Sequence, residues 1–381
     1  MKLVMTLMVR DEADIIAPML EHSLAQGIDL ILVTDNGSVD GTREIIESYV
    51  ATGRVLLTED PRHEKQQSSV VTAMARTAYE THGADWVINA DADEFWVAVD
   101  RRQTVKQAFE GIPKSVVTFF APVTDMTGPP ARTGSGVRRL LWRDHRNHRN
   151  LWERTGLHAH ASPDAVHIGS STVEVTQGNH AVNLEPGGEV PVGSFVEVLH
   201  LPWRSWEQYG GKVERSGAAY AANPMLRPSP RHHGMRDYRR FRADMLEHFY
   251  VFRHPIVDDE IVEGNDDELG RDDAIVTSLE SLLASGSAVR PDLLEKALDD
   301  GADEPYHRPD WDAAAEVARM VIPLESAYTE SLQSFRVALQ QAARDLRRAR
   351  AASRAPAPAP TFYRRARSFA GRVLRRLGLR K

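Results

Sequence analysis

The chain has 381 residues, of which 42% are hydrophobic and 27% charged, so it can bury a substantial core and its length suggests two or three units. Cysteine is absent, which excludes disulfides, thiolate metal sites and cysteine nucleophiles, and this fits a reducing compartment. The net charge of -7 is uneven, because residues 341–381 carry thirteen Lys and Arg against a single acid. No apolar run approaches the roughly 18 residues of a membrane span, and no signal-peptide pattern opens the sequence, so we expect neither export nor a spanning helix.

The first hundred residues alternate strand and helix patterns. Strands are predicted over 3–9, 28–33, 55–57 and 86–88, and helices over 14–26, 42–49 and 68–81. Such alternation predicts an α/β fold with a mainly parallel sheet and right-handed crossovers. In this arrangement ligands bind beyond the carboxyl ends of the strands.

Acidic residues follow two of these strands. Asp91 and Asp93 lie two residues apart after strand 86–88, so on extended backbone they point the same way and can offer oxygen ligands to one Mn²⁺ or Mg²⁺. The alternative is a strand end followed by a solvated acidic turn. Asp35 ends the second strand, where its carboxylate can bind a base or ribose; the alternative is a loop that caps the next helix, for which Asp40 is the predicted N-cap.

Three ordered blocks, residues 7–16, 35–42 and 84–95, resemble a family 2 glycosyltransferase with the GT-A fold. The Asp-Ala-Asp-Glu-Phe run at 91–95 is similar to one subgroup of that family, and residues 177–180 and 200–212 resemble its later blocks. The resemblance covers roughly residues 1–220. It implies a Rossmann-like, mixed but mainly parallel sheet flanked by helices, followed here by a helical C-terminal extension.

The resemblance also implies a nucleotide-diphosphate sugar bound across the carboxyl edge of the sheet. In this family Asp35 would contact the base, Arg10 or Glu12 the nucleoside, and Asp91 and Asp93 the ribose and the metal. Relatives often carry Asn where this chain has Asp11. A bound cation would neutralise the charge that develops on the leaving diphosphate.

Further site candidates come from later in the chain. His200 ends an apolar alternating stretch and can complete the shell of Mn²⁺, although a histidine at a strand end is also commonly structural. Arg204 is predicted to bind the diphosphate, because its guanidinium matches phosphate oxygens. Inversion, expected from the resemblance, needs a base, and the three candidates are His180, Glu94 and Asp125, each of which can equally be a structural hydrogen-bond partner.

Between residues 132 and 167 the sequence is rich in arginine and histidine. The arginines are Arg132, Arg138, Arg139, Arg143, Arg146, Arg149 and Arg154. This segment predicts either a basic loop over the donor diphosphate or a phosphorylated acceptor, or a solvated basic insertion. His158 and His160 have the spacing of metal ligands, but without cysteine or a four-ligand pattern a zinc site is not expected.

The remainder divides into short segments. We expect a glycosyltransferase domain at 1–222, a helical and acidic extension at 223–325, a long helix at 326–354, an Ala-Pro spacer at 355–360 and a basic tail at 361–381. Helical spacing also covers 206–222 at the end of the domain and, in the extension, 277–283, 291–298 and 311–320. The apolar face of the long helix can pack on the domain, pair with a second copy as a homodimer, or form a stalk.

The basic tail has apolar residues on one helical stripe and arginines elsewhere, which is typical of a helix at a membrane surface. Alternatives are a solvated tail, a calmodulin-like partner helix or a nucleic-acid tail; we expect no nucleic-acid partner. The predicted protein is a cytoplasmic, peripherally membrane-bound, metal-dependent glycosyltransferase acting on a glycan or lipid-linked acceptor in surface polysaccharide or glycoconjugate synthesis. The alternatives are a non-catalytic nucleotide-binding scaffold and a nucleotidyltransferase, whose glycine-rich basic loop is missing after the first strand.

Overall fold

The computed structural model describes residues 1–60, 67–155, 161–222, 233–258, 261–263, 268–299 and 303–354. The chain divides into two compact units, Met1–Ile322 and Pro323–Lys381, and each is described by itself. The predicted break at 223–230, the pair His158 and His160, the Ala-Pro spacer and the basic tail lie outside the described residues.

The first unit is built on a six-stranded sheet with the order β3-β2-β1-β4-β9-β6. Its strands β1 (Leu3–Val9), β2 (Leu30–Asp35), β3 (Val55–Glu59) and β4 (Trp86–Ala90) pair in parallel. Strand β9 (Asp164–Ile168) runs antiparallel to its two neighbours, β4 and β6 (Thr118–Ala121). The predicted α/β fold with a mixed, mainly parallel sheet is therefore confirmed. All four parallel strands start within two residues of their predicted positions.

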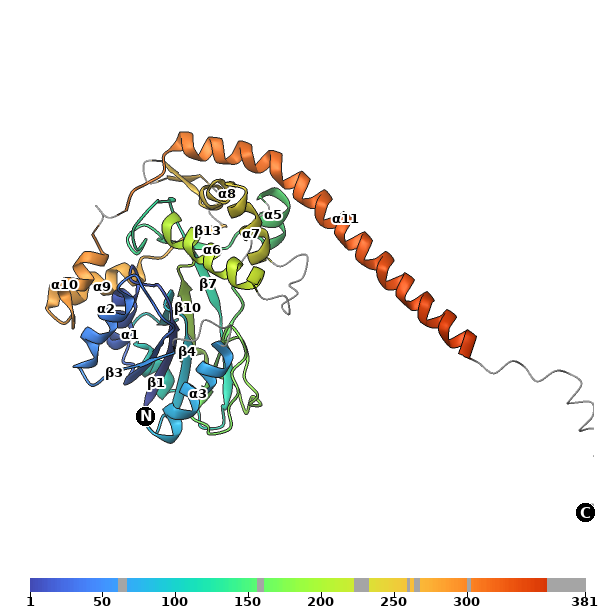
Figure 1. The fold of residues 1–381 in the computed structure, drawn as a ribbon. Helices are drawn as coiled ribbons and strands as arrows, with labels where there is room; N and C mark the ends of the chain where they lie inside the picture. The colour runs from blue at the N-terminus through green and yellow to red at the C-terminus, as the bar shows by residue number, and fades with distance from the viewer. Residues whose placement is uncertain are drawn as a thin grey trace, which may run out of the picture. The chain divides into compact units, whose positions relative to one another are not determined.

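Helices cover both faces of this sheet, as Figure 1 shows for α1 (Ile16–Ala25) and α2 (Thr42–Val50) on one side and α3 (Gln67–Glu80) on the other. The strands are apolar on both faces for this reason. Leu3, Met5 and Leu7 belong to the core shared with α1 and α2, whereas Val4 between them belongs to the core under α3. Each of these side chains is 0% exposed, which contributes roughly 1.5–3 kcal/mol per side chain.

A second sheet, whose strands alternate along the chain with the last strands of the first sheet, carries part of the site. It consists of β5 (Glu94–Ala98), β7 (Val123–Thr127), β8 (Trp142–Asp144), β10 (Val196–His200) and β13 (Leu269–Arg271), in the order β13-β8-β7-β10-β5. Residues 91–93 connect β4 of the first sheet to β5 of the second. In the register of this sheet His200 lies opposite Glu94 on one side and Asp125 on the other, so the strand pairing itself gathers three candidate residues.

The other elements pack around these sheets. They are α4 (Val105–Glu110), α5 (His148–Thr155), a 3-10 helix (Val192–Ser194), α6 (Trp206–Ala222), α7 (His233–Arg242), α8 (Leu246–Arg253), the pair β11 (Ile256–Asp258) and β12 (Ile261–Glu263), α9 (Ala274–Ser285) and α10 (Pro291–Ala297). The observed α6 has the predicted bounds. Buried Glu21 of α1 accepts hydrogen bonds from the backbone N–H groups of Val289 and Arg290 at 2.9 and 2.6 Å. These bonds fix the chain between α9 and α10 to α1, which packs on the first sheet. Residues 268–299 are thus part of the same compact unit as the N-terminal strands.

Two local predictions need correction. The N-cap of α2 is Gly41, whose φ of 100° favours glycine, while the Asp40 carboxylate accepts the Thr42 N–H at 3.0 Å from one residue further back. The helices predicted at 311–320 and 326–350 are one helix, α11 (Arg308–Arg354), which continues through Pro323. A proline removes one backbone N–H and normally marks a break, but Ala, Leu, Glu and Arg on both sides favour the helix enough for it to continue.

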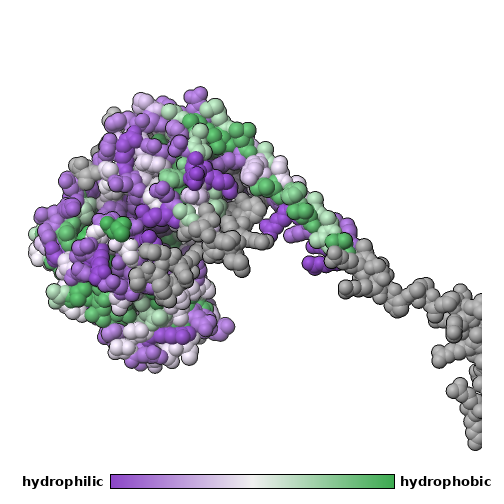
Figure 2. Space-filling model, in the orientation of Figure 1, coloured by the Kyte–Doolittle hydropathy of each residue, from purple (hydrophilic) through white to green (hydrophobic). Residues whose placement is uncertain are grey.

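Exposed apolar side chains recur along the part of α11 that lies in the second unit (Figure 2), among them Leu324, Phe335, Leu339 and Leu346. The predicted apolar face is therefore present on the helix. Among the described residues, none of the helices combines the length and the hydropathy that a transmembrane segment needs.

Candidate functional site

The site centres on the turn that joins β4 to β5. The Asp91 N–H donates to Glu94 Oε2 at 2.9 Å, and the Glu94 N–H donates back to the Asp91 carbonyl at 3.2 Å, so the turn is closed on itself. The Leu201 N–H donates to the Asp93 carbonyl at 2.9 Å, which fixes the turn to the end of β10. These backbone contacts hold Asp91 and Asp93 at the carboxyl edge of the first sheet, as predicted.

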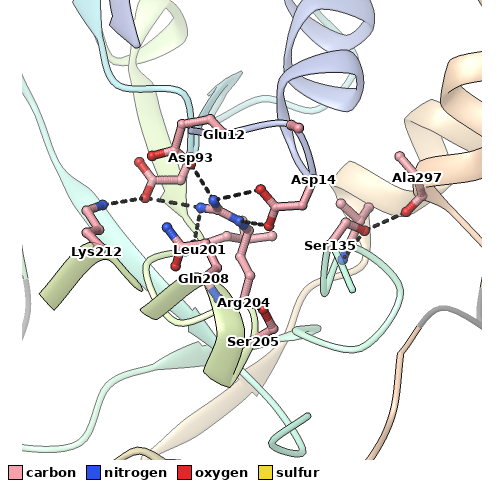
Figure 3. A network of polar contacts seen from close by, with 12 residues as sticks. Glu12, Asp14, Asp93, Ser135, Leu201, Arg204, Ser205, Gln208, Lys212 and Ala297 are labelled. Carbon is pink, nitrogen blue, oxygen red and sulfur yellow. Dashed lines mark hydrogen bonds and ion pairs between the residues drawn. The ribbon is translucent and has the colours of Figure 1, made fainter. Parts of the chain in front are cut away.

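Cationic side chains surround Asp93, which is only 2% exposed (Figure 3). Arg204 Nη1 and Lys212 Nζ both lie 3.3 Å from Asp93 Oδ2, and His200 Nε2 lies 3.7 Å from Oδ1. Burial alone would raise the pKa of Asp93, but the charges of Lys212, His200 and Arg204 outweigh it and hold this pKa well below its usual range. Asp93 is therefore a carboxylate at neutral pH.

Arg204 lies at the centre of the contacts in Figure 3 and is 0% exposed. It donates to Asp14 through Nε at 2.7 Å and Nη2 at 3.1 Å, and Nη2 also pairs with Glu12. The prediction that Arg204 binds the diphosphate does not match this geometry, because the guanidinium is enclosed by carboxylates of its own chain. Its observed role is to hold Glu12, Asp14 and Asp93 together, and burial still raises the pKa of Glu12 to about 7 despite this cation.

Lys212 is the cation of this cluster that reaches solvent. It lies on α6 and its side chain is 48% exposed, whereas the Asp93 carboxylate beneath it is buried. The negative charge of Asp93 raises the pKa of Lys212, so the amine stays protonated. Gln208, one helical turn earlier, has a side-chain amide without a hydrogen-bond partner among the described residues. Both polar atoms of this amide are buried, so of these two residues only Lys212 faces solvent beside Asp93.

His200 is held from behind by Asp125. Nδ1 lies 2.8 Å from Asp125 Oδ1, and since a carboxylate only accepts, Nδ1 carries the proton and Nε2 faces Asp93. Burial opposes protonation of the imidazole, but Asp93 and Asp125 outweigh it and raise the pKa of His200 well above its ordinary value. Asp125 is buried and also lies 3.9 Å from Arg253, so it orients His200 and is not a free base.

Asp91 has different neighbours from Asp93. Its Oδ1 accepts from two neutral amides, Gln67 Nε2 at 3.0 Å and Asn179 Nδ2 at 3.3 Å. Burial, followed by repulsion from Asp93, raises the pKa of Asp91 to about 6. Burial and the carboxylates of Asp164 and Asp91 also raise the pKa of Glu94 well above its usual range. Both carboxyl groups therefore bind a proton more tightly than an ordinary carboxyl group does.

His180 is the base candidate that is open to solvent. Its side chain is 45% exposed, and its Nδ1 lies 3.2 Å from Oδ1 of the fully buried Asp164. The hydrogen bond to Asp164 raises the pKa of His180. Asn179, the preceding residue, is the one that donates to Asp91, so His180 lies next to the acidic turn.

The loops after β1 and β2 are joined into one surface at the same sheet edge. The Val39 N–H donates to Asp11 Oδ1 at 2.9 Å, and the Glu12 N–H donates to Thr42 Oγ1 at 2.7 Å. Asp35 is buried and accepts from the Ser38 N–H and hydroxyl, so its carboxylate shapes this loop. Arg10 is partly exposed on this surface. The structure thus brings Arg10, Glu12 and Asp35 to the edge where the nucleoside was predicted.

The arginine-rich segment has a different role from the predicted phosphate-binding loop. Arg143 pairs with Glu197 and Asp272 at 2.6 and 2.8 Å, Arg139 with Asp303 at 2.9 Å. Arg132, Arg138 and Arg146 likewise pair with Glu247, Glu280 and Asp144. Four of these arginines connect β8 and its flanking loops to acids elsewhere in the fold, and Arg146 pairs within the β8 segment, so for these five the hypothesis of a basic loop over the diphosphate is wrong.

The predicted three-residue metal set is not assembled. Among the described residues, no group of three His, Asp or Glu side chains is arranged to hold a metal ion. Asp93 and His200 nevertheless present a carboxylate oxygen and an imidazole nitrogen 3.7 Å apart, which is too long for a good hydrogen bond. Mn²⁺ and Mg²⁺ at diphosphates are commonly held by one or two protein ligands and by phosphate oxygens. The donor set therefore fits a cation that arrives with its substrate, with Asp91 outside the set.

Two site residues were not predicted: Gln67 and Asp164. Asp14, Asn179 and Lys212 were noted only as parts of family blocks. Ser205, Gln208 and Lys212 follow helical steps of three and four, which places them on one face of α6, and this spacing could have identified Lys212. The partners of Arg204 and His180 are separated from them by 190 and 16 residues, and nothing in the local pattern marks such pairs.

Comparison with known proteins identifies the family of the N-terminal part of the chain. Residues 7–163 match the family model described as "Glycosyl transferase family 2". These residues belong to glycosyltransferase family 2. The predicted family and the predicted enzyme class, a glycosyltransferase, are therefore confirmed.

Solved structures also resemble this chain at low identity. S. aureus TarS (residues 1–349) is 12% identical, with 87% of this chain and 92% of that chain covered and a TM-score of 0.33; its complex with UDP-GlcNAc is 11% identical, with 84% and 92% covered and a TM-score of 0.34. Glucosyl-3-phosphoglycerate synthase from Mycobacterium tuberculosis, in complex with Mn²⁺, UDP and glucosyl-3-phosphoglycerate, is 16% identical, with 44% and 56% covered and a TM-score of 0.22. No curated protein sequence matched the chain.

Proposed function

We propose that this chain transfers a sugar from a nucleoside-diphosphate sugar to an acceptor hydroxyl, with inversion at the anomeric carbon. The observation that carries the proposal is the ionised, buried Asp93 beside His200 and the solvent-facing amine of Lys212, at the carboxyl edge of the parallel strands. A glycosidase would need two opposed carboxyl groups around a sugar, whereas here the ionised carboxylate is surrounded by cations. Such a site suits a diphosphate leaving group.

Each part of the donor has a candidate partner. Asp93 and His200 would hold Mn²⁺ or Mg²⁺, which when bound supplies positive charge to the leaving diphosphate. Lys212 is placed to contact phosphate oxygens directly, because its amine is charged and half of its side chain is exposed. Arg204 keeps Asp93 ionised and in position without touching the donor. Arg10, Glu12 and Asp35 form the surface proposed for the nucleoside.

Calorimetric titration with a panel of nucleoside diphosphates, in Mn²⁺, in Mg²⁺ and in EDTA, tests the donor site. We expect one diphosphate to bind with the cation and to lose that binding in EDTA and in Asp93→Ala. A matched control is Asp312→Asn, which removes an exposed carboxylate from α11 and should bind like the wild type. Binding that is insensitive to both EDTA and Asp93→Ala would refute the metal-assisted site. Binding without any sugar transfer would favour the scaffold alternative.

For localisation, we propose a peripheral position at the cytoplasmic face of a membrane, with a glycan or lipid-linked acceptor. The support is the sequence pattern of the tail at 361–381, where arginines flank one apolar stripe. Each basic residue near an anionic surface contributes about 1 kcal/mol. Co-sedimentation with anionic liposomes should therefore retain the full chain and not a truncation that ends at Pro360, and equal sedimentation of the two would count against the anchor.

A further inference from the structure

His180 lies on a rigid hairpin turn beside the acidic turn. Val175 and Val182 form an antiparallel bridge, and between them Gly178 and Asn179 have φ values of 78° and 61°. Two consecutive positive φ values are the mark of the tight turn that suits twisted strands. The Asn179 carbonyl accepts the Ala165 N–H at 2.9 Å, which fixes the turn to β9. The imidazole is therefore presented from a fixed backbone.

Asp164 determines which nitrogen of this imidazole is free. It is 0% exposed at the start of β9, and its Oδ1 lies 3.2 Å from His180 Nδ1. Because an ionised carboxylate can only accept, Nδ1 carries the proton and Nε2 keeps its lone pair. A Cβ at Gly178 would lie 2.9 Å from Nε2, so glycine at this position also keeps the space beside that nitrogen open.

The other two base candidates are committed elsewhere. Asp125 is buried against His200 and Arg253. Glu94 accepts the Asp91 N–H and is 6% exposed. Neither carboxyl group offers an exposed lone pair, whereas the side chain of His180 is 45% exposed. Accessible geometry therefore favours the histidine among the three.

We propose that His180, oriented by Asp164, is the general base of the transfer reaction, an inference that rests on the proposed function. His180 Nε2 takes the proton of the acceptor hydroxyl while the acceptor oxygen forms its bond to the anomeric carbon. The bond from that carbon to the diphosphate breaks in the same step, and its electron pair leaves on the diphosphate oxygen. The imidazolium that results is stabilised by Asp164, a positioning residue, and then releases its proton to solvent.

The charged groups that face His180 are Asp164 and, more weakly, Asp91. Both favour the imidazolium, and the resulting rise in the pKa of His180 makes it a stronger base. A base must be neutral to act, so the rate should rise with pH through this raised pKa. Removing the carboxylate at 164 should move that limb of the profile to lower pH and weaken the base.

Two measurements test the pair and its role. The first is the titration of full-length protein labelled with ¹⁵N-histidine, followed by long-range ¹H–¹⁵N spectra, with His180→Gln used to assign the signal. We expect the Nδ1–H tautomer in the wild type and a lower pKa of His180 in Asp164→Asn. This readout needs no activity. An Nε2–H tautomer, or an unchanged titration in Asp164→Asn, would overturn the pairing.

The second measurement is the release of nucleoside diphosphate from sugar donors that carry the nucleotide identified by calorimetry, with water as the acceptor. His180→Gln should lower kcat on the order of 10²- to 10⁴-fold with unchanged affinity for the diphosphate, and Asp164→Asn should lower kcat less and shift the pH profile. The exposed His307→Gln is the matched control and should behave as the wild type. Wild-type turnover in His180→Gln would overturn the base assignment. If the wild type binds no nucleoside diphosphate, the donor site is refuted, while the pairing of His180 with Asp164 is still decided by the titration.

Discussion

Asp91 and Asp93 differ by two positions in the chain, yet the protein gives them opposite surroundings. Asp93 is contacted by Arg204, Lys212 and His200, and its pKa is held well below the usual range. Asp91 is contacted by neutral amides, and its pKa is raised to about 6. Identical side chains in one motif therefore have pKa values shifted in opposite directions, because cations contact Asp93 directly but act on Asp91 only weakly against its burial and the repulsion from Asp93.

This difference separates the site into two halves. On the side of Asp93, the ionised carboxylate is contacted by Arg204, His200 and Lys212, and the exposed amine of Lys212 is placed to attract an anionic diphosphate. On the side of Asp91, repulsion from Asp164 helps to raise the pKa of Asp91 and that of Glu94. The exposed imidazole of His180 lies beside them and is paired with Asp164. Negative potential on that side favours a positively charged imidazolium, as proton transfer from an acceptor requires.

Removing the central cation should have the largest effect on stability. Arg204→Met leaves Glu12, Asp14 and Asp93 without their shared partner in a buried setting, and breaking such a buried pair costs about 3–5 kcal/mol. Denaturant-induced unfolding measures the change. Arg102→Met is the matched control, because Arg102 is 88% exposed and its pair with Asp100 should contribute little. A change in Arg204→Met as small as in the control would show that the carboxylates do not depend on this cation.

The sequence predicted the elements around this cluster better than the cluster itself. Apolar runs located β1 to β4, since buried parallel strands are apolar on both faces, and the helical spacing of 206–222 located α6. The second sheet was not predicted as such, because strands of three to five residues carry little periodicity. Two helices were predicted, at 311–320 and from 326, where α11 is one helix, because the strong helix formers on both sides of Pro323 favour its continuation.

Chemical type could be predicted for the site, but pairing could not. Asp91, Asp93 and His200 were identified because acids and histidines at strand ends face the ligand edge, and Glu12 was identified through the family resemblance. Arg204 was expected to bind phosphate, and only its burial among acids 111 to 192 residues away shows otherwise. The arginines after residue 131 were predicted to form a phosphate loop on composition alone. Most of their carboxylate partners, such as Glu197 for Arg143, lie far along the chain and cannot be identified from the local sequence.

Removing each aspartate charge should change stability in opposite directions. In EDTA, Asp91→Asn should stabilise the protein by about 1–3 kcal/mol, because it removes a carboxylate whose ionisation the fold disfavours. Asp93→Asn should destabilise it by about 1.5–3 kcal/mol, because Arg204 and Lys212 lose a charged acceptor. Chemical denaturation at neutral pH provides both values. Shifts of the same sign in the two variants would contradict the division of the site.

The stabilisation by Asp91→Asn should depend on pH. In the folded protein the pKa of Asp91 is about 6, above its ordinary 3.8, so the unfolded chain releases this proton at lower pH. The wild type therefore loses stability as pH rises from about 4 to about 6, and the variant does not lose this contribution. The difference between the two free energies of unfolding should be near zero below this window and full above it. A difference that is constant with pH would exclude ionisation of Asp91 as its cause.

Lys212 should give the smallest change in stability and a clear change in binding. Its side chain is 48% exposed, so its pair with Asp93 is screened by water, and Lys212→Met should alter the free energy of unfolding by less than about 1 kcal/mol. The same change removes a cation from the surface proposed for the diphosphate, so we expect about tenfold weaker calorimetric binding, corresponding to about 1.4 kcal/mol. Lys296→Met, an exposed lysine of α10, is the control. Arg204 still contacts Asp93 in this variant, so a loss of binding without a loss of stability would show that Lys212 binds the diphosphate whereas Arg204 stabilises the site. Unchanged binding would mean that Lys212 does not contact the diphosphate, and would leave Asp93 and its metal as the contact.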